Sequence, residues 1–171
     1  MPPYTDTRSR VLCVDDDLEA CEMLNELLKS HQIEVTCAQT AAEAWPLIRA
    51  GCFDLYLLDA WLPVLDGFEF CRQIRALDSN TPIVFYSGAA YDVDKLKGMA
   101  AGATAYVIKP DVERLIETIS NLISTGRANH VAARWVSDEC RPAESCLSAQ
   151  ASELKLRALD LTQTSHSQIF R

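Results

Sequence analysis

Residues 55–67 read LYLLDAWLPVLDG, and their first four residues show a pattern that recurs along the chain. These four residues form a short apolar run that Asp59 closes. Four similar runs occur at Val11–Val14, Ile33–Cys37, Ile83–Tyr86 and Ala105–Ile108. The starts of the five runs lie 22, 22, 28 and 22 residues apart. Short runs rich in Val, Ile, Leu and Tyr are typical of strands that are buried on both faces of a parallel sheet.

Apolar residues at helical spacing fill the gaps between these runs. The clearest stripe consists of Val112, Leu115, Ile116, Ile119, Leu122 and Ile123. Gly126 stands where a C-cap glycine would end this last helix. The second helix opens with a capping box at Thr40 and Glu43, stops near Gly51, and contains Pro46, which should kink it.

Five strands alternating with five helices predict an α/β fold of the (βα)5 type. In this fold a doubly wound five-stranded parallel sheet is covered by helices on both faces. We expect residues 1–8 to be a flexible arm and residues 9–125 to hold the whole repeat. Residues 126–171 differ in kind, and we expect a C-terminal extension, partly disordered or with one docking helix at 149–161.

Composition excludes several classes of protein. The 171 residues carry 16 Lys and Arg against 24 Asp and Glu, for a net charge of −8, which disfavours nucleic acid as a partner. No apolar run approaches the roughly 20 residues that a membrane-spanning helix needs. The seven Cys are odd in number and no secretory signal is evident, so we expect a cytoplasmic protein with reduced thiols.

Ligands of open parallel sheets bind beyond the carboxyl ends of the strands. Asp15 and Asp16 follow the first run, Asp59 the third, Ser87 the fourth and Lys109 the fifth. Three carboxylates in one cleft either raise one another's pKa or bind a cation. Oxygen ligands favour Mg²⁺ or Mn²⁺, and a site neutralised in this way can admit a phosphoryl group.

The same residues belong to an ordered set of motifs: VDDD at 14–17, LDAWLP at 58–63 with DG at 66–67, YSG at 86–88 and YVIKP at 106–110. In order and spacing this set resembles the receiver domain of bacterial response regulators, of the stand-alone type. The resemblance covers residues 9–125. It implies a flavodoxin-like strand order, 2-1-3-4-5, and a role in two-component signal transduction.

The resemblance also implies roles for the acidic residues. Asp59 would be the phosphoacceptor, modified to 4-aspartylphosphate. Asp16 and Asp59 would ligate Mg²⁺ (or Mn²⁺) directly, together with the backbone carbonyl of Trp61, and Asp15 would do so mostly through water. Asp17, by contrast, is expected to cap the first helix.

The remaining motif residues would act on the phosphoryl group. Lys109 would contact it and pair with Asp59 beforehand, and Pro110 would follow a cis peptide bond. Ser87 would move to donate a hydrogen bond to it, and Tyr106 would then turn inward as the second switch residue. Trp61 lies two residues after the acceptor, and we expect its large side chain to shield Asp59 from water.

The function implied is a phosphoacceptor rather than a turnover enzyme. Its partners would be a sensor histidine kinase or a histidine phosphotransfer protein, and a downstream protein bound at the face of the fourth helix, fifth strand and fifth helix. Ala103, Thr104 and Ala105 carry no charge, which argues against the charge-paired dimer of the winged-helix branch of the family.

Two alternatives remain open. The first is a DNA-binding transcriptional regulator that uses residues 126–171. The second is an Asp-nucleophile phosphatase of the haloacid dehalogenase type, which needs an Asp where this sequence has Trp61. Cys140, Cys146 and His130 do not have the spacing of an ordinary zinc site.

Overall fold

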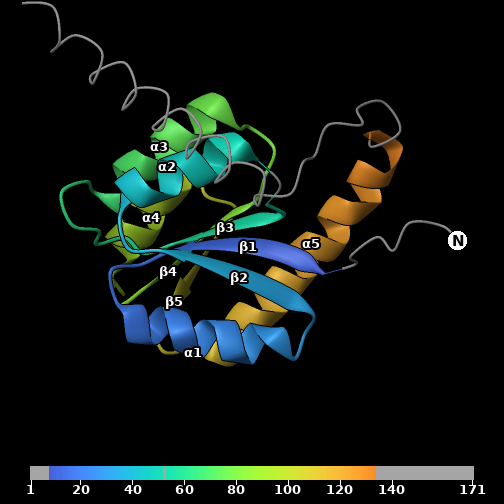
Figure 1. The fold of residues 1–171 in the computed structure, drawn as a ribbon. Coiled ribbons are helices and arrows are strands. Elements are labelled where there is room, and N and C mark those ends of the chain that lie inside the picture. The colour runs from blue at the N-terminus through green and yellow to red at the C-terminus, as the bar shows by residue number, and fades with distance from the viewer. Residues whose placement is uncertain (1–7, 52, 134–171) are drawn as a thin grey trace, which may run out of the picture. The chain divides into compact units, whose positions relative to one another are not determined.

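The computed structural model describes residues 8–51 and 53–133, in which five strands alternate with five helices (Figure 1). The strands are β1 (Ser9–Val14), β2 (Ile33–Ala38), β3 (Leu55–Leu58), β4 (Ile83–Ser87) and β5 (Ala105–Ile108). The helices are α1 (Leu18–Lys29), α2 (Ala41–Ala50), α3 (Gly67–Leu77), α4 (Asp92–Ala100) and α5 (Val112–Ala133). All pairs of neighbouring strands are parallel, in the order β2-β1-β3-β4-β5, which confirms the predicted fold.

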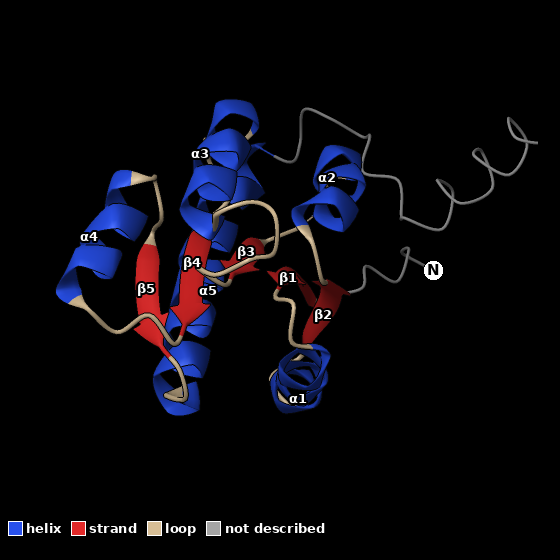
Figure 2. Cartoon of the chain, turned by 90° about the vertical axis from the view of Figure 1, so that its left-hand side faces the viewer, coloured by secondary structure: helices blue, strands red, loops and turns tan. Residues whose placement is uncertain are grey.

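Alternate residues of each strand pack into different cores, because successive side chains point to opposite faces of a sheet. One core joins the sheet to α2 and α3 and includes Leu12, Leu58 and Phe85. The other joins the sheet to α1 and α5 and includes Leu57 and Val84. Figure 2 shows α2 and α3 on one side of the strands and α1 on the other. Burial on both faces explains why the strands are continuous apolar runs.

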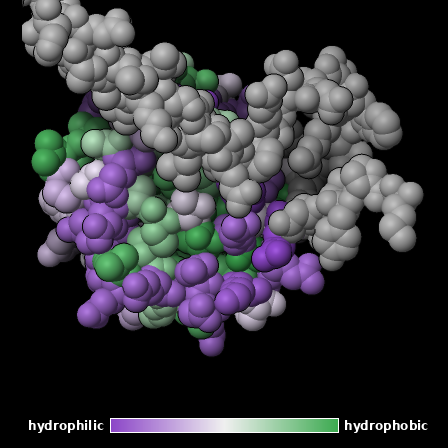
Figure 3. Space-filling model, in the orientation of Figure 1, coloured by the Kyte–Doolittle hydropathy of each residue, from purple (hydrophilic) through white to green (hydrophobic). Residues whose placement is uncertain are grey.

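The helix starts follow the capping residues in the sequence. The Asp17 carboxylate accepts hydrogen bonds from the backbone N–H groups of Glu19 and Ala20, so it caps α1 as expected. The Thr40 hydroxyl accepts from the N–H of Glu43 at the start of α2. The Glu43 carboxylate accepts from the N–H of Gln39, one residue earlier than in a complete capping box. Hydrophilic side chains gather over α1 along the lower edge of the face drawn in Figure 3.

The sequence prediction was wrong about the end of the last helix. α5 continues through Gly126 to Ala133, and the positive φ angles among the described glycines occur at Gly51 and Gly102. A glycine inside a helix costs only about 1 kcal/mol relative to alanine, and the residues after Gly126 include three alanines, the best helix former. α2 contains Pro46 and extends from Ala41 to Ala50.

Several predictions concern residues that the structure does not describe. The arm at 1–7, the candidate helix at 149–161 and the thiols Cys140 and Cys146 lie outside the described residues. Among the helices that are described, none combines the length and the apolar character that crossing a membrane requires.

Candidate functional site

Three charged side chains meet beyond the carboxyl ends of β1, β3 and β5. The Lys109 Nζ lies 2.6 Å from Oδ2 of Asp15 and 3.2 Å from Oδ1 of Asp59. Only 4% of the Asp15 side chain and 8% of the Asp59 side chain are exposed, against 26% for Lys109. Two nearly buried carboxylates therefore share one ammonium group and keep an excess negative charge.

Lys109 lies closer to Asp15 than to Asp59. Pairing with Asp59 was expected, whereas the shorter contact with Asp15 was missed, because side-chain distances across neighbouring strands leave no mark in the sequence. Burial lowers the pKa of Lys109, but the hydrogen bond to Asp15 and the charges of both carboxylates outweigh it, so the net shift is upward. Burial raises the pKa of Asp15, and the hydrogen bond from Lys109 opposes this only in part.

The loop after β3 holds the Asp59 carboxylate in place. Its Oδ2 accepts a hydrogen bond from the backbone N–H of Trp61, while Oδ1 faces Lys109. The Trp61 residue is 69% exposed, so its ring stands largely in solvent. Asp16 is also exposed, at the rim of the site. The structure thus brings Asp15, Asp59 and Lys109 together and leaves Asp16 at the edge.

Gly67 allows this loop to close. A Cβ at position 67 would collide with the backbone oxygen of Asp59 and would lie 2.9 Å from the Cα of Ala60. The Gly67 N–H also donates to the carbonyl of Ala60 at 3.1 Å. The start of α3 therefore packs directly on the backbone that carries the acceptor. The Asp66–Gly67 pair was noted in the sequence, but its steric reason required the structure.

Ser87 and Tyr106 form a second group beside the acidic residues. Ser87 is completely buried, and its hydroxyl oxygen accepts from the N–H of Ala89 at 3.3 Å. Tyr106 is half-buried, stacks on Phe85 at 5.6 Å between ring centroids, and donates its hydroxyl to the carbonyl of Ala89 at 2.8 Å. Burial raises the pKa of Tyr106. Both predicted switch residues therefore contact the same loop residue, Ala89.

Two further features surround Lys109. Its peptide bond to Pro110 is cis, as the sequence motif implied. Its Nζ lies 5.7 Å above the centre of the Tyr86 ring, a cation–π contact that sequence reasoning missed.

The donor chemistry of the site fits a divalent cation that keeps most of its water. Within the described part of the chain, no three His, Cys, Asp or Glu side chains come together as a closed metal-binding group. Mg²⁺ is usually bound by one or two carboxylates with water and phosphate oxygens completing its octahedron. The Asp15 and Asp59 carboxylates lie on the same Lys109 ammonium group, and the exposed Asp16 lies at the rim beside them, so the site meets that requirement.

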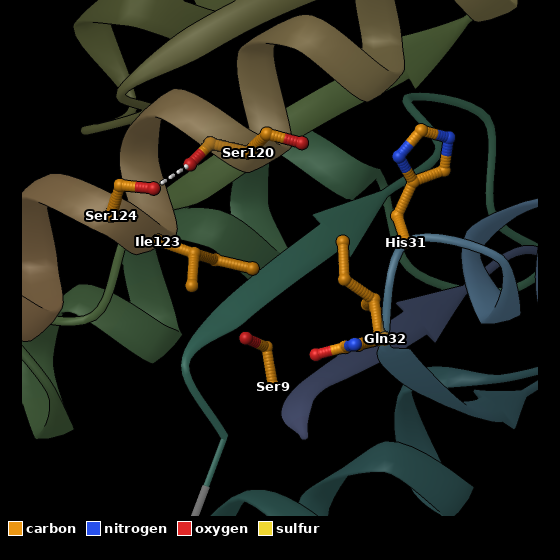
Figure 4. A pocket seen from close by; sticks show the side chains of 7 residues that line it. Ser9, His31, Gln32, Ser120, Ile123 and Ser124 are labelled. Carbon is orange, nitrogen blue, oxygen red and sulfur yellow. Dashed lines mark hydrogen bonds between the residues drawn. The ribbon is translucent and has the colours of Figure 1, made fainter. Parts of the chain in front are cut away.

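A separate hollow lies at the opposite end of β1 and β2, against α5 (Figure 4). It encloses about 170 Å³ and is lined by Ser9, His31, Gln32, Ile33, Ser120, Ile123 and Ser124. Ligand pockets usually enclose about 300–1,000 Å³. This small hollow contains none of the acidic residues, and His31 is exposed.

Comparison with known proteins identifies the same part of the chain. The family model described as the response regulator receiver domain matches residues 11–120. The chain is 37% identical over 103 residues to the DNA-binding response regulator MtrA of Mycobacterium tuberculosis. These residues make up 60% of this chain and 45% of that protein. It is 38% identical over 101 residues to the transcriptional regulatory protein YvrH of Bacillus subtilis, 58% of this chain and 42% of that protein.

The chain thus spans less than half the length of these relatives. Their names do not support the expectation that nucleic acid is excluded as a partner, since MtrA is named a DNA-binding regulator.

Solved structures agree with the fold. The chemotaxis response regulator CheY4 of Vibrio cholerae matches with a TM-score of 0.63 and 31% identity, covering 68% of this chain and 99% of that one. A CheY-like receiver domain protein from Methanospirillum hungatei matches with a TM-score of 0.67 and 28% identity, covering 72% of this chain and 99% of that one.

Proposed function

The chain belongs to the response regulator receiver domain family, and from this premise we propose that Asp59 accepts a phosphoryl group from a phosphohistidine. The donor would be a sensor histidine kinase or a histidine phosphotransfer protein. The observation that carries the proposal is the convergence of Asp15, Asp59 and Lys109 at one rim of the sheet.

In this reaction an Asp59 carboxylate oxygen attacks phosphorus, a P–O bond forms and the P–N bond to the donor histidine breaks. The electron pair stays on the leaving imidazole nitrogen, which takes a proton from solvent. Asp16, Asp59 and the Trp61 carbonyl would hold Mg²⁺ or Mn²⁺, with Asp15 acting through water, and the ion would offset the negative charge on the phosphoryl oxygens.

Lys109 and Ser87 have the chemistry to stabilise the product. Lys109 already lies between Asp15 and Asp59, and its ammonium group can follow the charge from carboxylate to phosphoryl oxygen. The buried Ser87 hydroxyl has a proton to donate to a phosphoryl oxygen. If Ser87 moves toward the phosphoryl group, its contact with Ala89 is lost, and Tyr106 can leave the same loop to fill the space.

The signal would leave through the face formed by α4, β5 and α5. Four large apolar residues stand out there, and they are 48–78% exposed: Tyr91, Val93, Leu96 and Met99. Apolar residues on an outward helix face are typical of protein interaction sites. A change in Tyr106, which packs against α4 at Gly98, would reach this surface directly.

Intact mass after incubation with Mg²⁺ and acetyl phosphate tests the assignment. We expect an added mass of one phosphoryl group that does not form in excess EDTA and is absent in Asp59→Asn. Asp66→Asn is the matched control, because Asp66 lies in the same loop and caps α3 outside the acidic cluster. An adduct that persists in Asp59→Asn, or no adduct in the parent chain, would refute the proposal.

A second candidate is a DNA-binding regulator that uses residues 126–171, favoured by the names of the relatives. Fluorescence anisotropy with duplex DNA at several salt concentrations distinguishes the two. Binding by the full chain that a chain ending at residue 133 lacks would support DNA output. The receiver family match leaves no support for a phosphatase of the haloacid dehalogenase type.

A further inference from the structure

Three thiols from three elements lie together at the carboxyl end of the β1–β2 pair. Cys13 of β1 and Cys37 of β2 are register partners, so their side chains point to the same face of the sheet. Cys21 of α1 covers them, with its Sγ 3.7 Å from the Sγ of Cys13. Cys13 and Cys21 are buried, whereas Cys37 is exposed.

The three thiols differ in access but interact with one another. The neighbouring Cys21 thiol and burial raise the pKa of Cys37 above its ordinary value. The Cys13 thiol is the largest cause that raises the pKa of Cys21, to about 12. A raised pKa lowers the fraction of reactive thiolate, so the cluster should react slowly, and its case depends on the exposure of Cys37 and on the contacts among the three thiols.

We propose that this cluster is an oxidation site, in which Cys37 reacts with a hydroperoxide and Cys21 then forms a disulfide with it. In the first step the Cys37 sulfur attacks the peroxide, an S–O bond forms, the O–O bond breaks, and water or an alcohol leaves. In the second step the Cys21 sulfur attacks the sulfenic acid, an S–S bond forms and water leaves.

Overall the two thiols lose two electrons and two protons to one peroxide. Cys13, which touches Cys21, can exchange into this bond, so the oxidised form contains Cys21 linked to one of the two strand thiols.

The geometry favours this chemistry over a metal site. A disulfide needs Cα atoms about 4.4–6.8 Å apart and sulfurs that can close to about 2.05 Å. The 3.7 Å contact between Cys21 and Cys13 lies within reach of a small side-chain rotation, and Cys37, the register partner of Cys13, also interacts with the Cys21 thiol. Among the described residues no group of three side chains is placed to hold a metal ion. The Cys21 Sγ also lies 4.0 Å from the backbone oxygen of Asp15, so the cross-link would form beside the acidic rim.

Treatment of the full chain with hydrogen peroxide tests the proposal, followed by alkylation and peptide mapping without reduction. We expect a mass loss of two hydrogens, peptides that link Cys21 to Cys37 or Cys13, and a higher melting temperature that dithiothreitol reverses. Cys37→Ser should slow the cross-link strongly, because it removes the exposed entry point. Cys71→Ser is the matched control, since Cys71 is buried in the other core and should leave the rate unchanged.

Three outcomes would overturn the proposal: no peptide linked through Cys21, an unchanged rate in Cys37→Ser, or oxidation confined to other cysteines. Cys37 is exposed, so its variant should fold, and circular dichroism verifies this. The measurement does not depend on phosphorylation of Asp59, so its failure would leave the proposed function untouched.

Discussion

At the scale of single residues, Lys109 has the largest effect on the acidic rim. From β5 it extends past β4 to reach carboxylates on both β3 and β1. Without it, Asp15 and Asp59 would be two nearly buried carboxylates with no counter-charge, an arrangement that costs several kcal/mol. The residues around Lys109 differ in how far their role depends on the side chain.

Trp61 is the residue whose role depends most on its side chain. Its N–H holds Asp59, a contact that any non-proline residue can make, whereas the exposed ring is supplied by tryptophan itself. We expect Trp61→Asn to shorten the lifetime of the phosphorylated state several-fold, because a polar side chain admits water to the acyl phosphate. Trp61→Phe should change it little. Decay of the phosphorylated mass with time measures this, and an unchanged or slower decay in Trp61→Asn would contradict it.

Val64 is strained. Its φ angle is +73°, in the left-handed region, and it is fully exposed. A β-branched residue there pays about 1–2 kcal/mol, which asparagine largely avoids. We therefore expect Val64→Asn to raise the melting temperature, by about 2–4 °C for each kcal/mol of backbone strain that the substitution removes. Circular dichroism measures this change. Val64→Ala keeps the Cβ and should gain less. A lower melting temperature in Val64→Asn would show that the strain is absent.

At the scale of elements, two glycines in the interior of helices, Gly98 of α4 and Gly126 of α5, have opposite roles. A Cβ at Gly98 would lie 2.9 Å from a Tyr106 ring carbon and 3.1 Å from a Phe85 ring carbon, whereas one at Gly126 would meet nothing within 4 Å. We expect Gly98→Ala to destabilise the fold by about 1–3 kcal/mol through overpacking. Gly126→Ala should stabilise it by up to about 1 kcal/mol.

Urea unfolding of both glycine variants measures these changes. A loss of stability in Gly126→Ala would mean that the helix ends there after all, with the glycine in a conformation that alanine resists.

The turn between α3 and β4 depends on Asp78. Its Oδ1 accepts from the N–H groups of Asn80 and Thr81, and its Oδ2 accepts from the Tyr56 hydroxyl at 3.1 Å. Burial acts to raise the pKa of Asp78, but these hydrogen bonds outweigh it and the pKa falls. A depressed carboxyl pKa contributes stability above the unfolded value of about 3.9, and this stability is lost as the pH falls through the folded value.

We therefore expect Asp78→Asn to be less stable than the parent chain at pH 7, by about 1 kcal/mol. The difference should shrink as the pH falls below 4. Urea unfolding at a series of pH values measures it, with Asp92→Asn as control because the Asp92 side chain is 93% exposed. A difference that is equal at pH 7 and pH 3 would contradict the expectation.

At the scale of the whole molecule, both hydrophobic cores of the described residues lie between Val11 and Ile123. A chain of residues 8–133 should therefore melt cooperatively at the temperature of the full chain, which also tests the predicted domain of 9–125. A chain that ends at Glu117 loses the buried Ile119 and Ile123, and we expect it not to fold. Calorimetry of the three chains distinguishes these outcomes. A large loss of stability in residues 8–133 would show that residues 1–7 or 134–171 support the core.

The sequence by itself determined the strands, the capping residues at which α1 and α2 begin, and the residues that meet at the acidic rim. Each of these depends on local pattern: burial on both faces makes a strand continuously apolar, and parallel strands bring all their carboxyl ends to one edge. The end of α5 was mispredicted because the cost of a helical glycine is small beside the propensity of its neighbours.

Only the tertiary structure decided the contacts that join distant segments. Four sets of contacts depend on how strands and helices pack. They are the preference of Lys109 for Asp15, the packing of Gly67 on the acceptor loop, the two separate hydrogen bonds of Ser87 and Tyr106 to Ala89, and the meeting of Cys13, Cys21 and Cys37. The physical reason is that a side-chain distance is set by the register and twist of neighbouring elements. The order of residues along one strand constrains these only to the level of a face and an edge.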